Sequence, residues 1–197
     1  MEYCTLMRKF DPQTISQQIL KQVGLQCISP IKIEKQNYFQ DLCCLDNANK
    51  YVSLNGGEVV FGWLLTVIGN VAIQLTAHAV VKRKDESLLC VTLDNSRENS
   101  VKFALDGTIN KLIKGKYLPG KFFPLIKDVN LNEYLECLQR HDRLRLSGAD
   151  NSHFEVQEIN QTCEDLYPHI LALAKKHTSR NDYCFCGSRV KAKKCCG

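Results

Sequence analysis

Apolar residues recur at helical spacing in some stretches of the chain and form strand-like runs in others. Helical spacing covers residues 11–24, 36–54, 131–146 and 160–177. Strand-like runs cover residues 27–33, 58–68, 71–82, 88–94 and 100–103. The Gly69-Asn70 pair and the charged stretch KRKDES separate the three central runs as turns. This pattern predicts an α+β fold in which an antiparallel sheet is flanked by helices.

Composition narrows the class of protein. The chain has 197 residues, of which 44% are hydrophobic and 24% are charged, as is ordinary for a globular protein. No apolar run is long enough to cross a membrane, and the start MEYCTLMRKFDP lacks the apolar core of a secretory signal. We therefore expect a cytoplasmic protein without a membrane segment, whose 11 cysteines stay mostly reduced.

The last residues differ from the rest in composition. The polar stretch 178–181 separates a predicted main domain, residues 1–178, from a small segment, residues 181–197. From Lys175 onward there are seven Lys and Arg residues and one acid, Asp182, whereas the whole chain carries a net charge of +5. Such a tail is typical of a solvated face, or of contact with an acidic protein or the ribosome. We also expect the main domain to fold without the segment.

One candidate site is a thiol followed along the chain by an imidazole and a carboxylate. The pair Cys43-Cys44 lies in a predicted helix, His78 in a predicted strand and Asp94 at the end of the next strand. An imidazole can take the proton of a thiol, and a third group can orient the imidazole. A helix start also favours the thiolate. The alternative is that both cysteines belong to the buried stripe of an amphipathic helix.

Several motifs resemble a known arrangement. CLDNANKYVSLNGGEVVFGW, QLTAHAVV and LLCVTL are similar to bacterial and phage sequences with the patterns C-x-x-N-V, GG-x-x-x-x-GW, IEAEFHAVW and LVDVTP. Those sequences resemble the transglutaminase and papain-like cysteine hydrolases. The resemblance implies a papain-like fold, a protein or peptide substrate, and Cys44 rather than Cys43 as the nucleophile. The other positions that it matches are Asn47, Gly56, Gly57, Gly62, Trp63 and His78.

The third member of the implied triad departs from this pattern. LLCVTL places Cys90 where the similar sequences have Asp, and a thiol cannot replace a carboxylate as acceptor for an imidazole. Asp94 follows on the same strand face and is the predicted orienting acid, with Asn95 as a further candidate. Backbone amides at the helix start would stabilise an oxyanion, with Gln36 or Gln40 as side-chain donors.

The segment NDYCFCGSRVKAKKCCG carries a second candidate site. Cys184 and Cys186 precede a Gly-Ser turn, and Cys195 and Cys196 follow it. Four thiolates brought together by a short turn suit a structural zinc ion, and so small a segment has no core of its own. The alternative is a basic tail with chance thiols. The spacing resembles the SEC-C motif, CPCGSGKKYKKCC, with all four ligand positions kept, and the resemblance implies a zinc knuckle.

Two functions follow from these features. The first is a cysteine hydrolase or acyl transferase acting on an amide, thioester or isopeptide bond, with Cys44 as nucleophile, His78 as base and Asp94 as orienting acid. The second is a non-catalytic module that presents a basic zinc knuckle to a protein or RNA partner. The order of the three residues favours the enzyme, whereas Cys90 and the basic tail favour the module.

Overall fold

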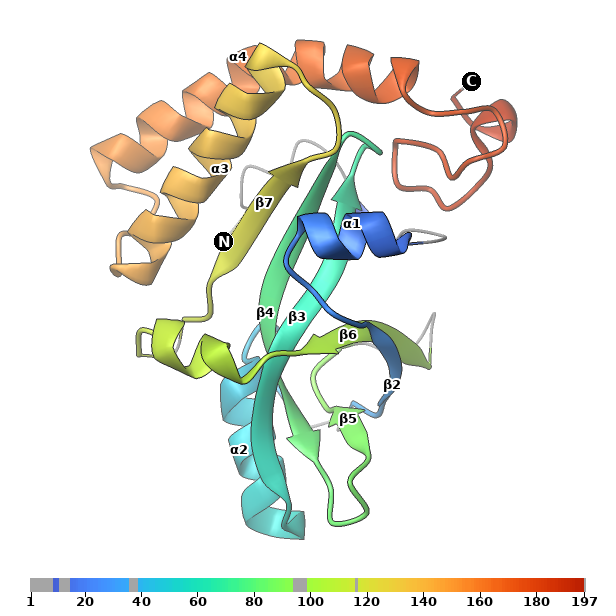
Figure 1. The fold of residues 1–197 in the computed structure, drawn as a ribbon. Coiled ribbons are helices and arrows are strands. Elements are labelled where there is room, and N and C mark those ends of the chain that lie inside the picture. The colour runs from blue at the N-terminus through green and yellow to red at the C-terminus, as the bar shows by residue number, and fades with distance from the viewer. Residues whose placement is uncertain (1–8, 11–14, 36–38, 94–98, 116, 197) are drawn as a thin grey trace. The chain divides into compact units, whose positions relative to one another are not determined.

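A computed structural model describes residues 9–10, 15–35, 39–93, 99–115 and 117–196, and its secondary structure is mixed α and β (Figure 1). The chain forms two compact units. The first unit contains residues 1–16, 65–75 and 120–197, and the second contains residues 17–64 and 76–119. Strands β3 (Glu58–Ile68) and β4 (Ala72–Lys82) therefore contribute residues to both units.

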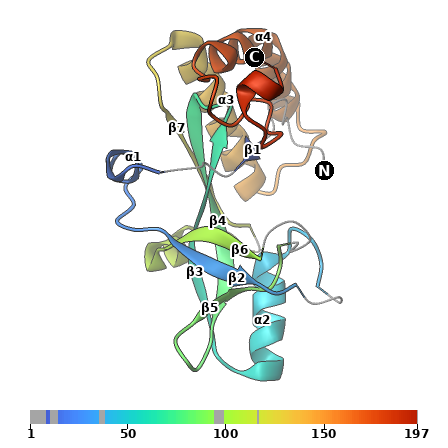
Figure 2. The same cartoon turned by 90° about the vertical axis from the view of Figure 1, so that its right-hand side faces the viewer.

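The second unit is built on a closed ring of strands (Figure 2). Its members besides β3 and β4 are β2 (Ser29–Ile33), β5 (Leu88–Cys90) and β6 (Ser100–Leu105). The order is β3-β6-β2-β5-β4, and pairing of β4 with β3 closes the ring. The predicted antiparallel sheet needs a correction here, because β2 runs parallel to β5 and the sheet is mixed. A parallel pair needs a long connection, and α2, β3 and β4 lie between these two strands in sequence.

Two residues of the GG-x-x-x-x-GW pattern have structural roles in this barrel. Gly62 pairs with Leu105 of β6, and a Cβ atom at Gly62 would lie 2.2 Å from the Ala104 carbonyl oxygen. Trp63 is completely buried, and its Nε1–H donates to Asp106 Oδ2 over 2.8 Å. The same Asp106 caps the short 3₁₀ helix η1 (Gly107–Leu112) by accepting from the Thr108 N–H. Close strand packing therefore accounts for the third glycine of the pattern, Gly62, and for the tryptophan.

The helices of the second unit are shorter than their sequence patterns indicated. Helix α2 (Cys44–Asn55) begins at Cys44, well inside the predicted range 36–54. Helix α1 (Gln17–Gln22) lies inside the predicted range 11–24, of which residues 11–14 lie outside the described residues. Helical spacing continues into flanking coil because it records which side chains are apolar and not where the backbone hydrogen bonds stop.

The first unit packs two long helices against the tip of the β3–β4 hairpin. Helices α3 (Val129–Leu146) and α4 (Phe154–Lys176) lie side by side in both ribbon views (Figures 1 and 2). Strand β1 (Lys9–Phe10) pairs with the end of β3, and β7 (Gly120–Pro124) lies next to β4. The core joins hairpin residues to both helices and includes Ile68, Val71, Ala72, Leu131, Tyr134, Ile159, Cys163, Ile170 and Ala174. No helix among the described residues is both long and apolar enough to span a bilayer.

Candidate functional site

The segment that follows α4 folds back on itself through a tight turn. An isolated bridge joins Tyr183 to Lys191, and the Cys184 N–H donates to the Val190 carbonyl over 2.8 Å. Gly187 and Arg189 both adopt left-handed backbone angles, with φ of +76° and +61°. The short 3₁₀ helix η2 (Ala192–Lys194) then returns the chain toward the turn. Both cysteine pairs are thereby brought to one place.

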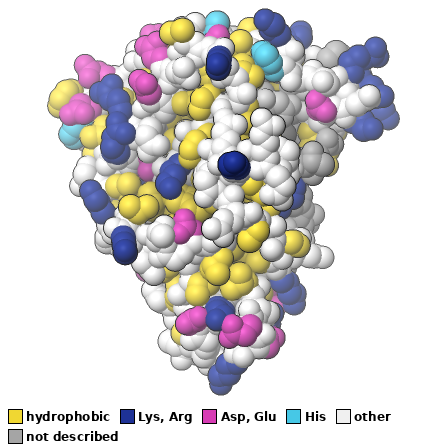
Figure 3. Space-filling model, viewed as in Figure 1, with side chains coloured by type: hydrophobic (Ala, Val, Ile, Leu, Met, Phe, Trp, Pro, Cys, Tyr) yellow, Lys and Arg dark blue, Asp and Glu magenta, His cyan; other side chains and the backbone are white. Residues whose placement is uncertain are grey.

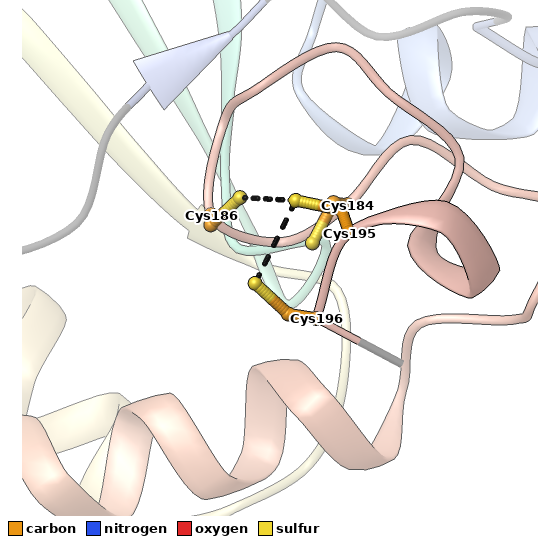
Figure 4. Close-up of side chains that lie close together, drawn as sticks. All are labelled: Cys184, Cys186, Cys195 and Cys196. Carbon is orange, nitrogen blue, oxygen red and sulfur yellow. Dashed lines mark hydrogen bonds between the residues drawn. The ribbon is translucent and has the colours of Figure 1, made fainter.

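The four sulfur atoms of this segment form a candidate metal centre. Cys184, Cys186, Cys195 and Cys196 have Sγ atoms that all lie within 4.8 Å of one another, and the side chains point toward a common centre (Figure 4). The Sγ of Cys195 lies 3.5 Å from that of Cys186 and 3.7 Å from that of Cys196. A tetrahedral zinc ion with bonds of about 2.3 Å would separate its sulfur ligands by about 3.8 Å. The cluster therefore fits a metal ion of this kind.

The protonation of these thiols also favours a cation. Burial opposes ionisation of Cys186, but hydrogen bonds from Ser188 and Cys184 outweigh it and lower the pKa of Cys186 to about 6. The neighbouring thiols Cys184, Cys195 and Cys186 raise the pKa of Cys196 to about 12. One thiolate of the cluster therefore forms readily, and its negative charge opposes ionisation of the next thiol. A divalent cation at the centre would remove this opposition and allow all four to ionise.

The segment that carries the candidate metal centre is anchored in the core of the first unit. Cys184 and Phe185 belong to the same buried cluster as Ile68, Val71 and Ala174. The predicted boundary between residues 178 and 181 stays a prediction, but this packing changes one expectation drawn from it. Because the segment supplies buried side chains to the core, we now expect its removal to destabilise the first unit.

A second group of chemically active side chains lies in the second unit. Cys44 is the first residue of α2, as the helix-start argument required, and Cys43 is its N-cap. The half-buried Cys44 thiol accepts a hydrogen bond from the Ala79 backbone N–H, so it lies beside the residue that follows His78. Burial nevertheless raises the pKa of Cys44, an effect opposed by hydrogen bonds from Ala79 and Leu45. The thiol, not the thiolate, is its form at neutral pH.

His78 contacts a different cysteine. Its Nε2 lies 3.2 Å from the Sγ of Cys90, the last residue of β5. The His78 residue is only 5% exposed and Cys90 is fully buried. Burial lowers the pKa of His78 to about 4 and raises the pKa of Cys90. Both groups are therefore uncharged at neutral pH, and the structure brings His78 together with the residue that replaces the implied Asp.

Asn47 connects the start of α2 to the loop after β5. Its Nδ2 donates to the Gln40 carbonyl over 2.7 Å and to Thr92 Oγ1 over 3.2 Å, and its Oδ1 accepts from the Gln40 N–H. The side chain is almost completely buried. The C-x-x-N pattern thus has a structural explanation. Its partner Thr92 carried no signal in the sequence, because a contact across 45 residues leaves no local pattern.

Other predicted residues of this group lie elsewhere or are not placed. Asp94, the predicted orienting acid, lies outside the described residues, as do Asn95 and Gln36. Gln40 is exposed, and its Oε1 lies 3.7 Å from Cys43 Sγ.

A hollow of about 320 Å³ lies in the first unit and is lined by residues of α3, α4 and their connection: His141, Arg145, Ala149, Asp150, Asn151, Ser152 and Val156. None of the predicted site residues lines it.

Comparison with known proteins adds no family. No protein-family model, no curated protein and no solved structure matches the chain. The functional argument therefore depends on the residues and their geometry.

Proposed function

We propose that this protein is a non-catalytic binding module that uses a structural zinc ion to present a basic surface to RNA. The observation that carries the proposal is the convergence of four Sγ atoms within 4.8 Å in a segment with little core of its own. Cys184, Cys186, Cys195 and Cys196 would hold the ion. Zinc would supply folding free energy and no redox chemistry.

The charge around the metal centre indicates the kind of partner. Seven exposed basic residues lie at the end of α4 and in the cysteine segment: Lys175, Lys176, Arg180, Arg189, Lys191, Lys193 and Lys194. Figure 3 shows Lys and Arg side chains gathered over the segment at the upper right. Asp182 is the one acid among them, and its carboxylate already accepts from the Ser179 N–H. A surface of this kind suits a phosphate backbone and predicts contacts without base specificity.

Metal analysis of the purified chain tests the zinc site. We expect one zinc per chain after purification without chelators, and loss of that zinc when Cys184 and Cys186 are replaced by Ser. A zinc content well below one per chain would contradict the site. Cys27→Ser is a suitable control, because Cys27 is an exposed cysteine outside the cluster.

RNA binding is tested separately, with fluorescence anisotropy of a short unstructured oligonucleotide. If three phosphates are contacted, affinity should fall about 20-fold between 50 and 200 mM salt. Replacing Lys191, Lys193 and Lys194 by Gln should abolish most of the binding. The matched control replaces three exposed lysines of the second unit, Lys50, Lys111 and Lys114. Equal loss in both variants, or binding to polyglutamate and not to RNA, would contradict the RNA proposal.

A cysteine hydrolase acting through Cys44, His78 and Asp94 stays the competing proposal. Its support is the position of Cys44 as the first residue of α2, where its thiol accepts a hydrogen bond from the backbone N–H of Ala79, the residue after His78. Against it stand the burial of His78 and the lowering of its pKa to about 4. An imidazole with that pKa is a poor proton acceptor for a thiol whose own pKa is raised.

A further inference from the structure

Three titratable side chains of the second unit approach one another from three different elements. Cys44 begins α2, His78 lies on β4 and Cys90 ends β5. In the antiparallel register of β4 and β5, Val81 is opposite Leu89, so His78 and Cys90 lie diagonally on the same face. Cys44 is close enough to Cys90 for an electrostatic effect on its pKa.

Cys90 faces one ring nitrogen of His78, and this contact determines which role residue 90 can have in a cysteine–histidine pair. Because Nε2 of His78 is engaged by Cys90 Sγ, Nδ1 is the nitrogen that could serve a second partner. In a cysteine–histidine pair the imidazole takes the thiol proton and becomes a cation. A third group that faces the other nitrogen stabilises that cation only if the group is an anion or a strong hydrogen-bond acceptor.

Cys90 is a weak acceptor in this position. Its Sγ also lies 3.5 Å from the Leu93 backbone nitrogen, in a contact that the N–H donates. The side chain is fully buried, which opposes formation of a thiolate. A neutral thiol beside His78 therefore offers no negative charge to a protonated imidazole, and burial removes the water that might otherwise do so.

We propose that Cys90 occupies the position of the orienting group beside His78, and that a thiol at this position leaves Cys44, the predicted nucleophile, without a proton acceptor. The chemical nature of residue 90 thus decides whether Cys44 and His78 can act together. Cys90 is a positioning residue in this scheme and touches no substrate. The inference concerns the second unit alone and does not depend on the zinc or RNA proposals.

The test is a gain of reactivity in Cys90→Asp. A carboxylate at residue 90 should raise the His78 titration midpoint, followed by the imidazole proton signals in NMR. It should also speed alkylation of Cys44 by iodoacetamide at pH 7 at least tenfold, measured by peptide mass spectrometry. Cys90→Ser, which is neutral and similar in size, should give no gain. Adding His78→Gln to Cys90→Asp should return the rate to the wild-type value.

The same labelling reports whether the variants fold. Cys137 and Cys163 are buried in the first unit and should stay unlabelled in a folded chain. If Cys90→Asp labels no faster than Cys90→Ser while these two stay protected, the proposal is overturned.

If the buried Asp unfolds the protein, the proposal is tested instead by introducing His78→Gln into the wild-type chain and measuring the Cys44 labelling rate. There His78→Gln should leave the Cys44 rate unchanged within twofold, because an imidazole whose cation is not stabilised takes no proton from Cys44. A several-fold slower rate in His78→Gln would overturn the proposal and support the hydrolase. Zinc content and RNA affinity should not change in any of these variants, so failure here is distinct from failure of the binding module.

Discussion

Asn70 Nδ2 donates to Thr178 Oγ1 over 2.9 Å, and this bond joins the β3–β4 turn to the residues that lead into the metal centre. The same amide donates to the Tyr183 carbonyl over 3.1 Å. Asn70 itself has a φ of +59°, a conformation that Asn and Gly tolerate better than other residues. A single turn residue therefore holds the hairpin and the start of the cysteine segment together.

Asn70→Gly should break the connection between the β3–β4 hairpin and the start of the cysteine segment. Gly keeps the backbone conformation and removes both side-chain bonds, so we expect a loss of about 1 to 2 kcal/mol in the free energy of unfolding. The free energy of zinc binding should weaken by a similar amount, because holding the segment in place is part of forming the site. Thr178→Val removes the acceptor of one of these bonds and also the bond that Thr178 Oγ1 donates to the Ala174 carbonyl over 2.7 Å, so its cost should be similar. Equal zinc affinity in wild type and Asn70→Gly would contradict this coupling.

Phe185→Ala tests whether the cysteine segment is part of the core. Phe185 is 7% exposed and belongs to the core of the first unit, so truncation should cost about 3 kcal/mol. Phe154→Ala is the matched control, because Phe154 is 65% exposed and its loss should stay within about 0.5 kcal/mol. Chemical denaturation measures both. A negligible effect of Phe185→Ala would restore the expectation that the segment is dispensable.

Gly62→Ala tests the structural explanation of the third glycine of the GG-x-x-x-x-GW pattern. The added Cβ would lie 2.2 Å from the Ala104 carbonyl oxygen and 2.3 Å from the Phe103 ring, so β3 and β6 would have to move apart. We expect a loss of about 3 kcal/mol or poor folding. Gly107→Ala is the control, since nothing lies within 4 Å of its Cβ position. Similar stabilities for the two variants would refute the packing argument.

Acid should destabilise the second unit through His78. The folded state holds the pKa of His78 at about 4, against 6.5 for an ordinary His. Between these values the unfolded chain binds more protons, so the free energy of unfolding falls as pH is lowered from 6.5 toward 4. The His78 contribution to this loss is about 3 kcal/mol. His78→Gln should flatten the pH dependence in that window, and an unchanged slope would show that His78 titrates normally.

Local patterns predicted the elements better than their arrangement. The strand over residues 58–68 was predicted with its observed bounds, and the strand over 71–82 begins one residue late at Ala72. Both have long apolar runs, and the Gly69-Asn70 turn separates one from the other. By contrast, no strand was predicted over residues 120–124, which form β7. A five-residue run that contains Pro carries too little periodicity to identify a strand.

The two candidate sites also differ in how far local sequence patterns could predict them. The four clustered cysteines could be found because their spacing within 13 residues brings them together by local turns alone. The contact between His78 and Cys90 could not, because it depends on how two strands are registered across the barrel.

The division of the chain between its two units sets an order of synthesis. The chain passes from one unit to the other after residues 16, 64, 75 and 119. Every residue of the barrel unit has therefore been translated once Pro119 has left the ribosome, whereas the helical unit still lacks both of its long helices. The last side chains that it needs include Cys195 and Cys196. The proposed metal site can therefore form only after every barrel residue has been translated, and nascent chains stalled before residue 195 should contain a folded barrel and only two of the four candidate ligands.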